Sequence, residues 1–168
     1  MTRIGYGFDS HEFHSGIPLR IGGITLAQDR GLSGHSDGDV LLHAITDALL
    51  GAIAAPDIGA LFPPSNPKWK GADSSVFLRE ALKRVGDAGY GLANLDATLI
   101  LAAPKILPHA AAICGHVAEL LGVQPDCVGL KAKTPEGLNL ENTAVAHVVV
   151  LLERTKRARN ATSKRTRR

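Results

Sequence analysis

The sequence predicts an α/β (α+β) fold in which helices pack on a mixed sheet in a single domain. Three observations lead to this prediction. The chain has 168 residues, a length that suits one ordinary domain with its own core. Hydrophobic residues make up 45% of the chain and charged residues 21%, which is the balance of a globular protein. Segments with strand-like alternation are interspersed with segments of helical periodicity, and this order favours a sheet covered by helices.

Two strand-like segments open the chain. Within Arg3–His11, alternate positions are occupied by Ile4, Tyr6 and Phe8, as in a half-buried strand. The segment Leu19–Leu26 is predicted to form a second short strand or a hairpin, with Gly22-Gly23 marking a turn or a bulge.

The first helix is predicted to follow the segment 35–39 (His-Ser-Asp-Gly-Asp) and to stop before Pro56. Ser36 is expected to cap this helix, with Asp39 three residues later as the acidic partner of a capping box. An apolar stripe at helical spacing supports the assignment and comprises Leu41, Ile45, Ala48, Leu49 and Ala52.

Two more helices and three more strands complete the predicted fold. One helix starts near Asp73-Ser74 and ends at Gly89, and the other follows Pro108 and is closed by Gly122. Strands are predicted over 95–101, 127–134 and 144–152. The last of them contains a continuous apolar run over 148–152, which is typical of a strand covered on both faces.

The C-terminal residues form a separate basic segment. From Arg154 to Arg168 there are eight Lys or Arg residues and no acid, and removing them leaves 11 bases against 16 acids, a body with a formal charge of about −5. We therefore expect a folded domain over 1–153 and a disordered, solvated tail over 154–168. Nucleic acid is not an expected partner, because the tail has no aromatic side chain for base stacking.

The sequence also shows no sign of a membrane protein. No run approaches the roughly 20 consecutive apolar residues that a membrane span needs. The opening residues Met1-Thr2-Arg3-Ile4 lack the pattern of a signal or transit peptide. We therefore expect a cytoplasmic protein that does not bind membranes.

Asp9, His11 and His43 are candidate metal ligands. In an extended segment, residues two apart point to the same side, so Asp9 and His11 can converge on one ion. His43 lies near the start of the first helix and off its apolar stripe. Three such ligands leave one tetrahedral position open, as in a catalytic zinc site. A helical His is, however, more often a hydrogen-bonded surface residue, and the spacing alone leaves both interpretations open.

Three further segments carry residues suited to phosphates or a nucleotide. The helix start at 35–39 suits simple capping, but free N–H groups there also attract phosphate, with His35 and Ser36 as donors. Segment 131–137 offers Lys and Thr for phosphates and Glu136 for magnesium, and it is equally suited to an ordinary polar turn. Segment 101–108 exposes backbone groups for a base edge, and it is also a plausible connector between a strand and a helix.

Taken together, these segments resemble the 2-C-methyl-D-erythritol 2,4-cyclodiphosphate synthases of the non-mevalonate isoprenoid pathway. The resemblance runs from Ile4 to about Leu152. It is carried by Gly-Phe-Asp-Ser-His (7–11), the run from His-Ser-Asp-Gly-Asp to Ala-Leu-Leu-Gly (35–51), Asp-Ile-Gly (57–59), Leu-Phe-Pro (61–63), Lys-Gly-Ala-Asp-Ser (70–74) and Ala-Pro-Lys-Ile-Leu-Pro-His (103–109).

The resemblance implies both an architecture and a reaction. The architecture is a mainly four-stranded mixed sheet covered by helices on one face, in a homotrimer assembled around the sheets with each active site between two subunits. The reaction converts 4-diphosphocytidyl-2-C-methyl-D-erythritol 2-phosphate to the 2,4-cyclodiphosphate and CMP, which makes the chain a cytoplasmic bacterial lyase. Because the substrate's own 2-phosphate attacks its β-phosphorus, no nucleophile from the protein is required.

The resemblance also implies roles for individual residues. Asp9, His11 and His43 match the ligands of zinc or another divalent transition metal, and Glu136 matches the ligand of a second metal, Mg²⁺ or Mn²⁺. His35 and Thr134 match the residues that position and stabilise the transferring phosphoryl group. The remaining matches are to substrate-binding positions: Ser36, Asp57, Ile58, Gly59, Phe62, Asn66, Leu101, Ala102, Ala103, Pro104, Lys105, Ile106, Leu107 and Lys133.

The sequence departs from the family pattern in two places. Lys133 stands where the family commonly has Thr. The segment 137–144 is about three residues shorter than usual and lacks the Arg that lines the cavity along the trimer axis, so binding of a terpenoid diphosphate there is not carried over. The alternative function for the same Asp/His/His site is a zinc-dependent phosphate-ester hydrolase, which would release CMP without forming a cyclic product.

Overall fold

A five-stranded mixed sheet is the centre of the fold in the computed structural model, which describes residues 1–155. Its strands lie in the order β4-β1-β7-β5-β6, and only β5 and β6 are paired in parallel. The prediction of four strands is corrected to five by a three-residue edge strand, which is too short to leave a periodic signal in the sequence. The strands are β1 (Thr2–Ser15), β4 (Arg30–Leu32), β5 (Tyr90–Ile100), β6 (Val128–Lys133) and β7 (Thr143–Arg154).

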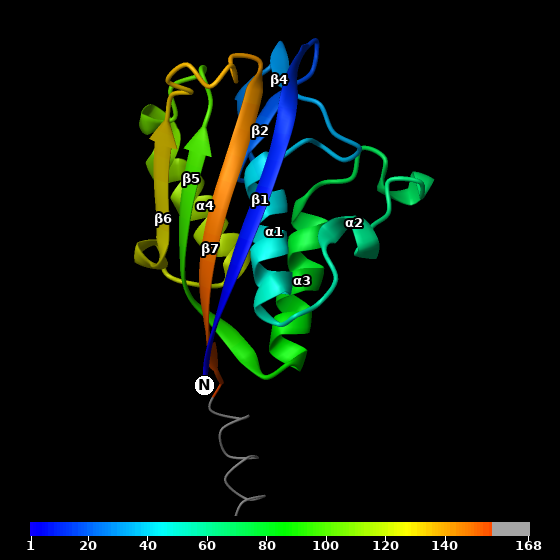
Figure 1. Ribbon diagram of the computed structural model, residues 1–168, viewed down its shortest axis with the longest axis vertical. Helices are drawn as coiled ribbons and strands as arrows, with labels where there is room; N and C mark the ends of the chain where they lie inside the picture. The colour runs from blue at the N-terminus through cyan, green and yellow to red at the C-terminus, as the bar shows by residue number, and fades with distance from the viewer. Residues whose placement is uncertain (156–168) are drawn as a thin grey trace, which may run out of the picture.

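The helices cover one face of this sheet, as predicted (Figure 1). Helix α1 (Val40–Ala52) lies on β1 and β7, and α4 (Ala110–Leu121) lies beside β6. Helix α3 (Ser75–Asp87) packs against α1, and the one-turn α2 (Ile58–Leu61) follows α1 in the chain. Outside the main sheet, β2 (Leu19–Ile21) and β3 (Ile24–Ala27) form the expected hairpin, with Gly22 and Gly23 in the turn at positive φ. Three short 3₁₀ turns complete the elements of residues 1–155: Pro67–Trp69, Leu107–His109 and Pro125–Cys127.

The opposite face of the sheet carries large apolar side chains that nothing in residues 1–155 covers. Ile4 is 70% exposed, Tyr6 57%, Phe8 49% and Val149 45%. The expectation that both faces of the 148–152 run are covered is therefore wrong within a single chain: Val148, Val150 and Leu152 are buried, but Val149 points outward.

Two glycines allow α1 to lie directly on the backbone of β1. A Cβ atom added at Gly5 would come to 1.8 Å from the carbonyl oxygen of Ala48, and one added at Gly7 would come to 1.9 Å from that of Ala44. Real Cβ atoms do not approach so closely, so only glycine fits at these positions. This close contact fixes the distance between the strand that carries Asp9 and His11 and the helix that carries His43.

The start of α1 differs from the predicted capping box. Asp39, not Ser36, caps the helix: its Oδ1 accepts hydrogen bonds from Leu42 N at 3.0 Å and from Gly22 N at 2.9 Å, and its Oδ2 accepts one from Gly23 N at 2.6 Å. The side chain is fully buried, and burial raises the pKa of its carboxyl group while the three N–H donors act to lower it. With Asp39 as its cap, the helix begins three residues later than it would with Ser36 as the cap. The Ser36 hydroxyl is therefore free to contact the site described below.

Replacing Asp39 is expected to destabilise the protein. Asp39→Ala leaves three N–H donors, two of them buried, without their acceptor, and we expect the free energy of unfolding to fall by about 2–3 kcal/mol. Urea denaturation followed by circular dichroism measures the change. Asp57 offers a matched control, because it caps the exposed helix α2 through one hydrogen bond to Ala60 N, and Asp57→Ala should cost less than about 1 kcal/mol. Equal losses for the two variants would contradict this account of the N-terminus of α1.

Two further predictions from the sequence concern membrane-spanning helices and the basic C-terminal tail. Within the described residues, none of the helices is long and apolar enough to cross a membrane. The predicted basic tail, 154–168, lies outside the described residues except for its first two positions, and Arg154 is the last residue of β7.

Candidate metal centre and substrate pockets

The three predicted metal ligands converge. Asp9 and His11 project from β1 and His43 from α1, and three of their ligand atoms form a nearly equilateral triangle. Asp9 Oδ2 lies 2.9 Å from His43 Nδ1 and 3.0 Å from His11 Nε2, and the two ring nitrogens are 3.0 Å apart. All three side chains are more than two-thirds buried.

This triangle suits a divalent transition metal. A tetrahedral ion with bonds of about 2.0–2.1 Å holds its ligand atoms about 3.3 Å apart, close to the spacing present. One carboxylate and two imidazoles are also the donor types that such ions prefer. Three protein ligands leave the fourth position for a substrate atom, which is the arrangement of catalytic rather than structural sites.

The electrostatics of the site favour a cation. Burial works against ionisation of Asp9, but hydrogen bonds from His11 and His43 and the charges of both rings outweigh it and hold the pKa of Asp9 at about 2. Burial likewise lowers the pKa of His43, while the hydrogen bond and charge of Asp9 more than offset it, so the pKa is raised. Asp9 is therefore ionised at neutral pH, whereas His43 must give up any proton on Nδ1 before it binds a metal.

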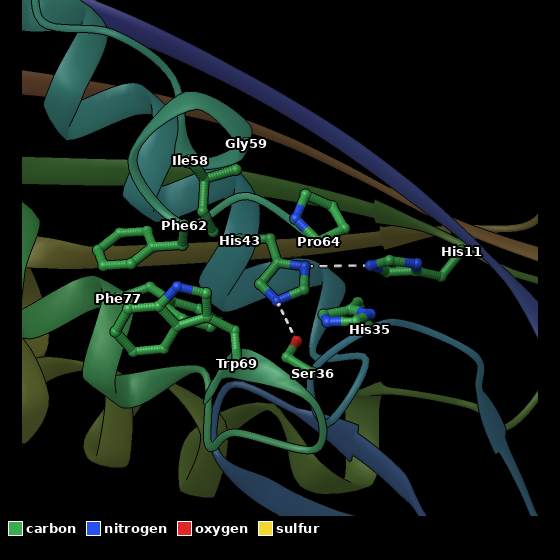
Figure 2. Close-up of a pocket in the computed structure, with 10 residues that line it drawn as sticks. All are labelled: His11, His35, Ser36, His43, Ile58, Gly59, Phe62, Pro64, Trp69 and Phe77. Carbon is green, nitrogen blue, oxygen red and sulfur yellow. Dashed lines mark hydrogen bonds between the residues drawn. The ribbon is translucent and has the colours of Figure 1, made fainter. Parts of the chain in front are cut away.

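A cavity of about 230 Å³ opens beside the metal ligands. Figure 2 shows the imidazoles of His11, His35 and His43 on one side of it, with aromatic rings on the other. Five predicted site residues besides the metal ligands line this cavity: His35, Ser36, Ile58, Gly59 and Phe62. Pro64, which lies between the predicted residues Phe62 and Asn66, also lines it, and sequence reasoning missed two others: Trp69 and Phe77.

The aromatic wall is a packed cluster. The ring of Phe62 lies 4.7 Å from that of Phe77 and 5.1 Å from that of Trp69, and Phe77 also lies 6.2 Å from the ring of His43. Trp69 precedes the helix predicted from Asp73-Ser74 to Gly89 and Phe77 lies within it, and neither residue is assigned a role in the site by the sequence. The chain's single Trp was the signal that could have pointed to this wall.

Two predicted substrate-binding residues act as helix caps next to this cavity and are not among its lining residues. Asp57 caps α2, and Asn66 Oδ1 accepts a hydrogen bond from Lys68 N at 3.0 Å at the start of the 3₁₀ turn 67–69. Ile58 N also donates to Asp47 Oδ1 at 2.8 Å, which ties the loop after α1 back to that helix.

The other predicted residues lie around a second cavity, of about 210 Å³, at the far edge of the sheet. It is formed where β5 and β6 end, and it shares no residue with the first cavity. Ala103 lies in the same loop, joined to Pro104 by a cis peptide bond, and Glu136 accepts a hydrogen bond from the Thr134 hydroxyl. The lining residues are Leu101, Ala102, Pro104, Lys105, Ile106, Leu107, Ala132, Lys133 and Thr134.

A mixed α/β domain with a possible metal site of Asp9, His11 and His43 beside a pocket has the features of an enzyme that acts on a small molecule. The chain belongs to the YgbB family, whose model matches residues 2–153. A 2-C-methyl-D-erythritol 2,4-cyclodiphosphate synthase from Koribacter versatilis is 68% identical over 154 residues, which cover 92% of this chain and 99% of that protein. The chloroplastic synthase of Oryza sativa is 57% identical over 155 residues, covering 90% of this chain and 70% of that protein.

Solved structures agree with these relatives. A 2C-methyl-D-erythritol-2,4-cyclodiphosphate synthase superimposes with a TM-score of 0.85 at 46% identity, covering 90% of this chain and all of that one. A form of this enzyme with bound CDP gives the same TM-score at 44% identity and the same coverage. The family predicted from the sequence motifs is confirmed, and with it a lyase of isoprenoid precursor biosynthesis.

Proposed function

We propose that this chain closes the eight-membered ring of 2-C-methyl-D-erythritol 2,4-cyclodiphosphate, with zinc bound by Asp9, His11 and His43. The observation that carries the proposal is the ligand triangle, with sides of 2.9–3.0 Å, at the edge of a pocket in a chain so similar to known synthases. A zinc ion there would polarise the β-phosphate as a Lewis acid. The hydrolase alternative is not supported, because the relatives are named as synthases.

The residues around the cavity would hold the substrate for ring closure. His35 and Ser36 are placed to donate hydrogen bonds to phosphate oxygens, and the aromatic wall of Phe62, Trp69 and Phe77 would keep water from the reacting phosphorus. Ile58 and Gly59 would hold the methylerythritol part. Because both reacting groups belong to one molecule, positioning supplies much of the acceleration.

The second cavity would receive the nucleotide. Its loop 101–107 presents backbone groups that suit a cytosine, and Lys133 and Thr134 lie beside it to contact the phosphates. Glu136, in contact with Thr134, would hold a second ion, Mg²⁺ or Mn²⁺, which would offset the negative charge of the phosphates.

We further propose a homotrimer in which each active site lies between two subunits. The two cavities share no residue and lie beside different strands of the sheet, which supports an arrangement in which the second cavity of one chain faces the metal site of another. The exposed apolar face formed by Ile4, Tyr6, Phe8 and Val149 supports assembly around the sheets, since such faces are typical of subunit interfaces.

The reaction can be tested by phosphorus NMR. The full chain, incubated with 4-diphosphocytidyl-2-C-methyl-D-erythritol 2-phosphate, zinc and magnesium, is expected to give equal amounts of CMP and the cyclic diphosphate. Enzyme stripped of zinc by a chelator should give neither product and should recover when zinc is returned. CMP accompanied by an uncyclised product would contradict the proposal and favour the hydrolase.

A further inference from the structure

His43 has hydrogen-bond partners on the ring nitrogen that faces away from the metal site. Its Nδ1 faces Asp9 and His11, while its Nε2 lies 2.8 Å from Ser74 Oγ and 2.9 Å from Ser36 Oγ. A neutral imidazole with a metal on Nδ1 carries its proton on Nε2 and can donate it to one acceptor. The two hydroxyls therefore compete for a single N–H.

Ser74 is the better-prepared acceptor. It is fully buried at the start of α3, and its hydroxyl donates to Asp37 Oδ1 while its backbone N donates to Asp37 Oδ2 at 3.2 Å. With its proton committed to Asp37, the Ser74 oxygen has lone pairs available for the imidazole N–H. Ser36 has no such commitment among the described residues, since its hydroxyl contacts only His43 and Ser74.

The Asp37 carboxylate is itself held in place. Arg20 Nη1 lies 3.7 Å from Asp37 Oδ2 and 3.6 Å from Asp73 Oδ2, and Asp37 N donates to Ala72 O at 3.1 Å. Arg20, Asp37, Ser74 and His43 thus form a continuous chain that ends at the metal site, and its first member lies on β2, far from His43 in the sequence.

We propose that Ser74 and Asp37 are positioning residues for zinc: they hold the His43 ring with its proton on Nε2 and its lone pair on Nδ1 toward Asp9 and His11. The proposal rests on the metal site proposed above. Partners of this kind fix the tautomer and the ring angle of a ligating His and increase its basicity. Ser36, which lines the cavity, is then left free to turn its hydroxyl to a bound phosphate.

Zinc affinity is the direct test. Titration of the metal-free protein against a chromophoric chelator is expected to show a 10- to 100-fold weaker Kd for Ser74→Ala, roughly the cost of losing such a partner. Ser74→Thr, which keeps the hydroxyl, should restore most of the affinity. Ser36→Ala removes the competing hydroxyl from the same nitrogen and should leave the Kd within about 2-fold of wild type.

A second measurement separates positioning from a general loss of structure. In the zinc-loaded protein, the His43 Nε2–H should give a slowly exchanging proton signal in ¹⁵N-edited NMR. The signal should persist in Ser36→Ala and Ser74→Thr and disappear in Ser74→Ala. If Ser74→Ala does not fold, Asp37→Asn tests the same chain, because it weakens the acceptor for the Ser74 hydroxyl and should raise the Kd several-fold.

The possible outcomes are distinct. Wild-type affinity and a retained Nε2–H signal in Ser74→Ala would overturn the proposal, and so would a larger effect for Ser36→Ala than for Ser74→Ala. Failure of the underlying metal site would look different: His11→Ala would then bind zinc as tightly as the wild-type chain.

Discussion

Mixing two inactive variants of this chain is expected to restore activity. His11→Ala removes a proposed metal ligand at the first cavity, and Thr134→Ala removes a hydroxyl at the second. Each variant alone should lose about 10²–10³-fold in kcat, the usual cost of one group that stabilises developing charge. Suppose that each active site of a trimer takes one cavity from each of two subunits. Trimers that assemble at random from equal amounts of the two variants then have both cavities intact at about one site in four. Coexpression of the two variants should therefore yield about a quarter of the wild-type activity in the unseparated mixture, and about a third in purified hybrids, where one site in three is intact.

The control uses two variants from the same half of the site. His11→Ala mixed with His43→Ala should remain inactive, because every metal centre then lacks a ligand. The hybrids are made by coexpression with two different affinity tags, and CMP release is measured after two-step purification. Absence of rescue in purified hybrids that contain both chains would contradict the intersubunit site.

Gly7→Ala is expected to disturb both stability and metal binding. The added methyl group would lie 1.9 Å from the Ala44 carbonyl oxygen, which belongs to a helix backbone and cannot turn aside as a side chain can. Overpacked cores typically lose 1–3 kcal/mol, and a backbone clash of this kind should cost about 3 kcal/mol or more. If the variant folds, α1 must move away from β1, which widens the ligand triangle and weakens zinc binding.

Chemical denaturation and zinc titration measure the two effects of Gly7→Ala. Gly115 is the matched control: it lies in the middle of α4, and an added Cβ there meets no atom within 4 Å. Gly115→Ala should stabilise the protein by about 0.5–1 kcal/mol, because alanine loses less backbone entropy than glycine in a helix. Wild-type stability and zinc affinity in Gly7→Ala would show that the strand and the helix are not in direct contact.

Local sequence patterns predicted much of the fold and the convergence of the candidate metal ligands. Alternation placed Asp9 and His11 on one side of a strand, and the apolar stripe of α1 left His43 outside it; the three converge as expected. The sequence could not place the two halves of the substrate site, because the separation of Thr134 from His35 depends on the strand order β1-β7-β5-β6. Family resemblance alone linked those residues.

The errors have local physical causes. Ser36 and Asp39 are both good capping residues. Asp39 is the one that caps the helix because the turn at Gly22 and Gly23 brings two N–H groups to its carboxylate. Ser74 was expected only as part of a helix start. Its role depends on Asp37, which lies 37 residues away in the chain, and no spacing rule connects the two.

The hydrogen bonds of the Asp39 carboxylate also bear on local unfolding of the protein. A two-stranded hairpin outside the main sheet would usually fray on its own, at a lower free energy than the rest of the domain. Here the turn amides of Gly22 and Gly23 bind the carboxylate that caps α1, so the hairpin cannot detach without exposing the first turn of the helix. We therefore expect the hairpin, the helix and the His43 imidazole on it to unfold as one cooperative unit, which would shield the proposed metal site from local unfolding that begins at the hairpin.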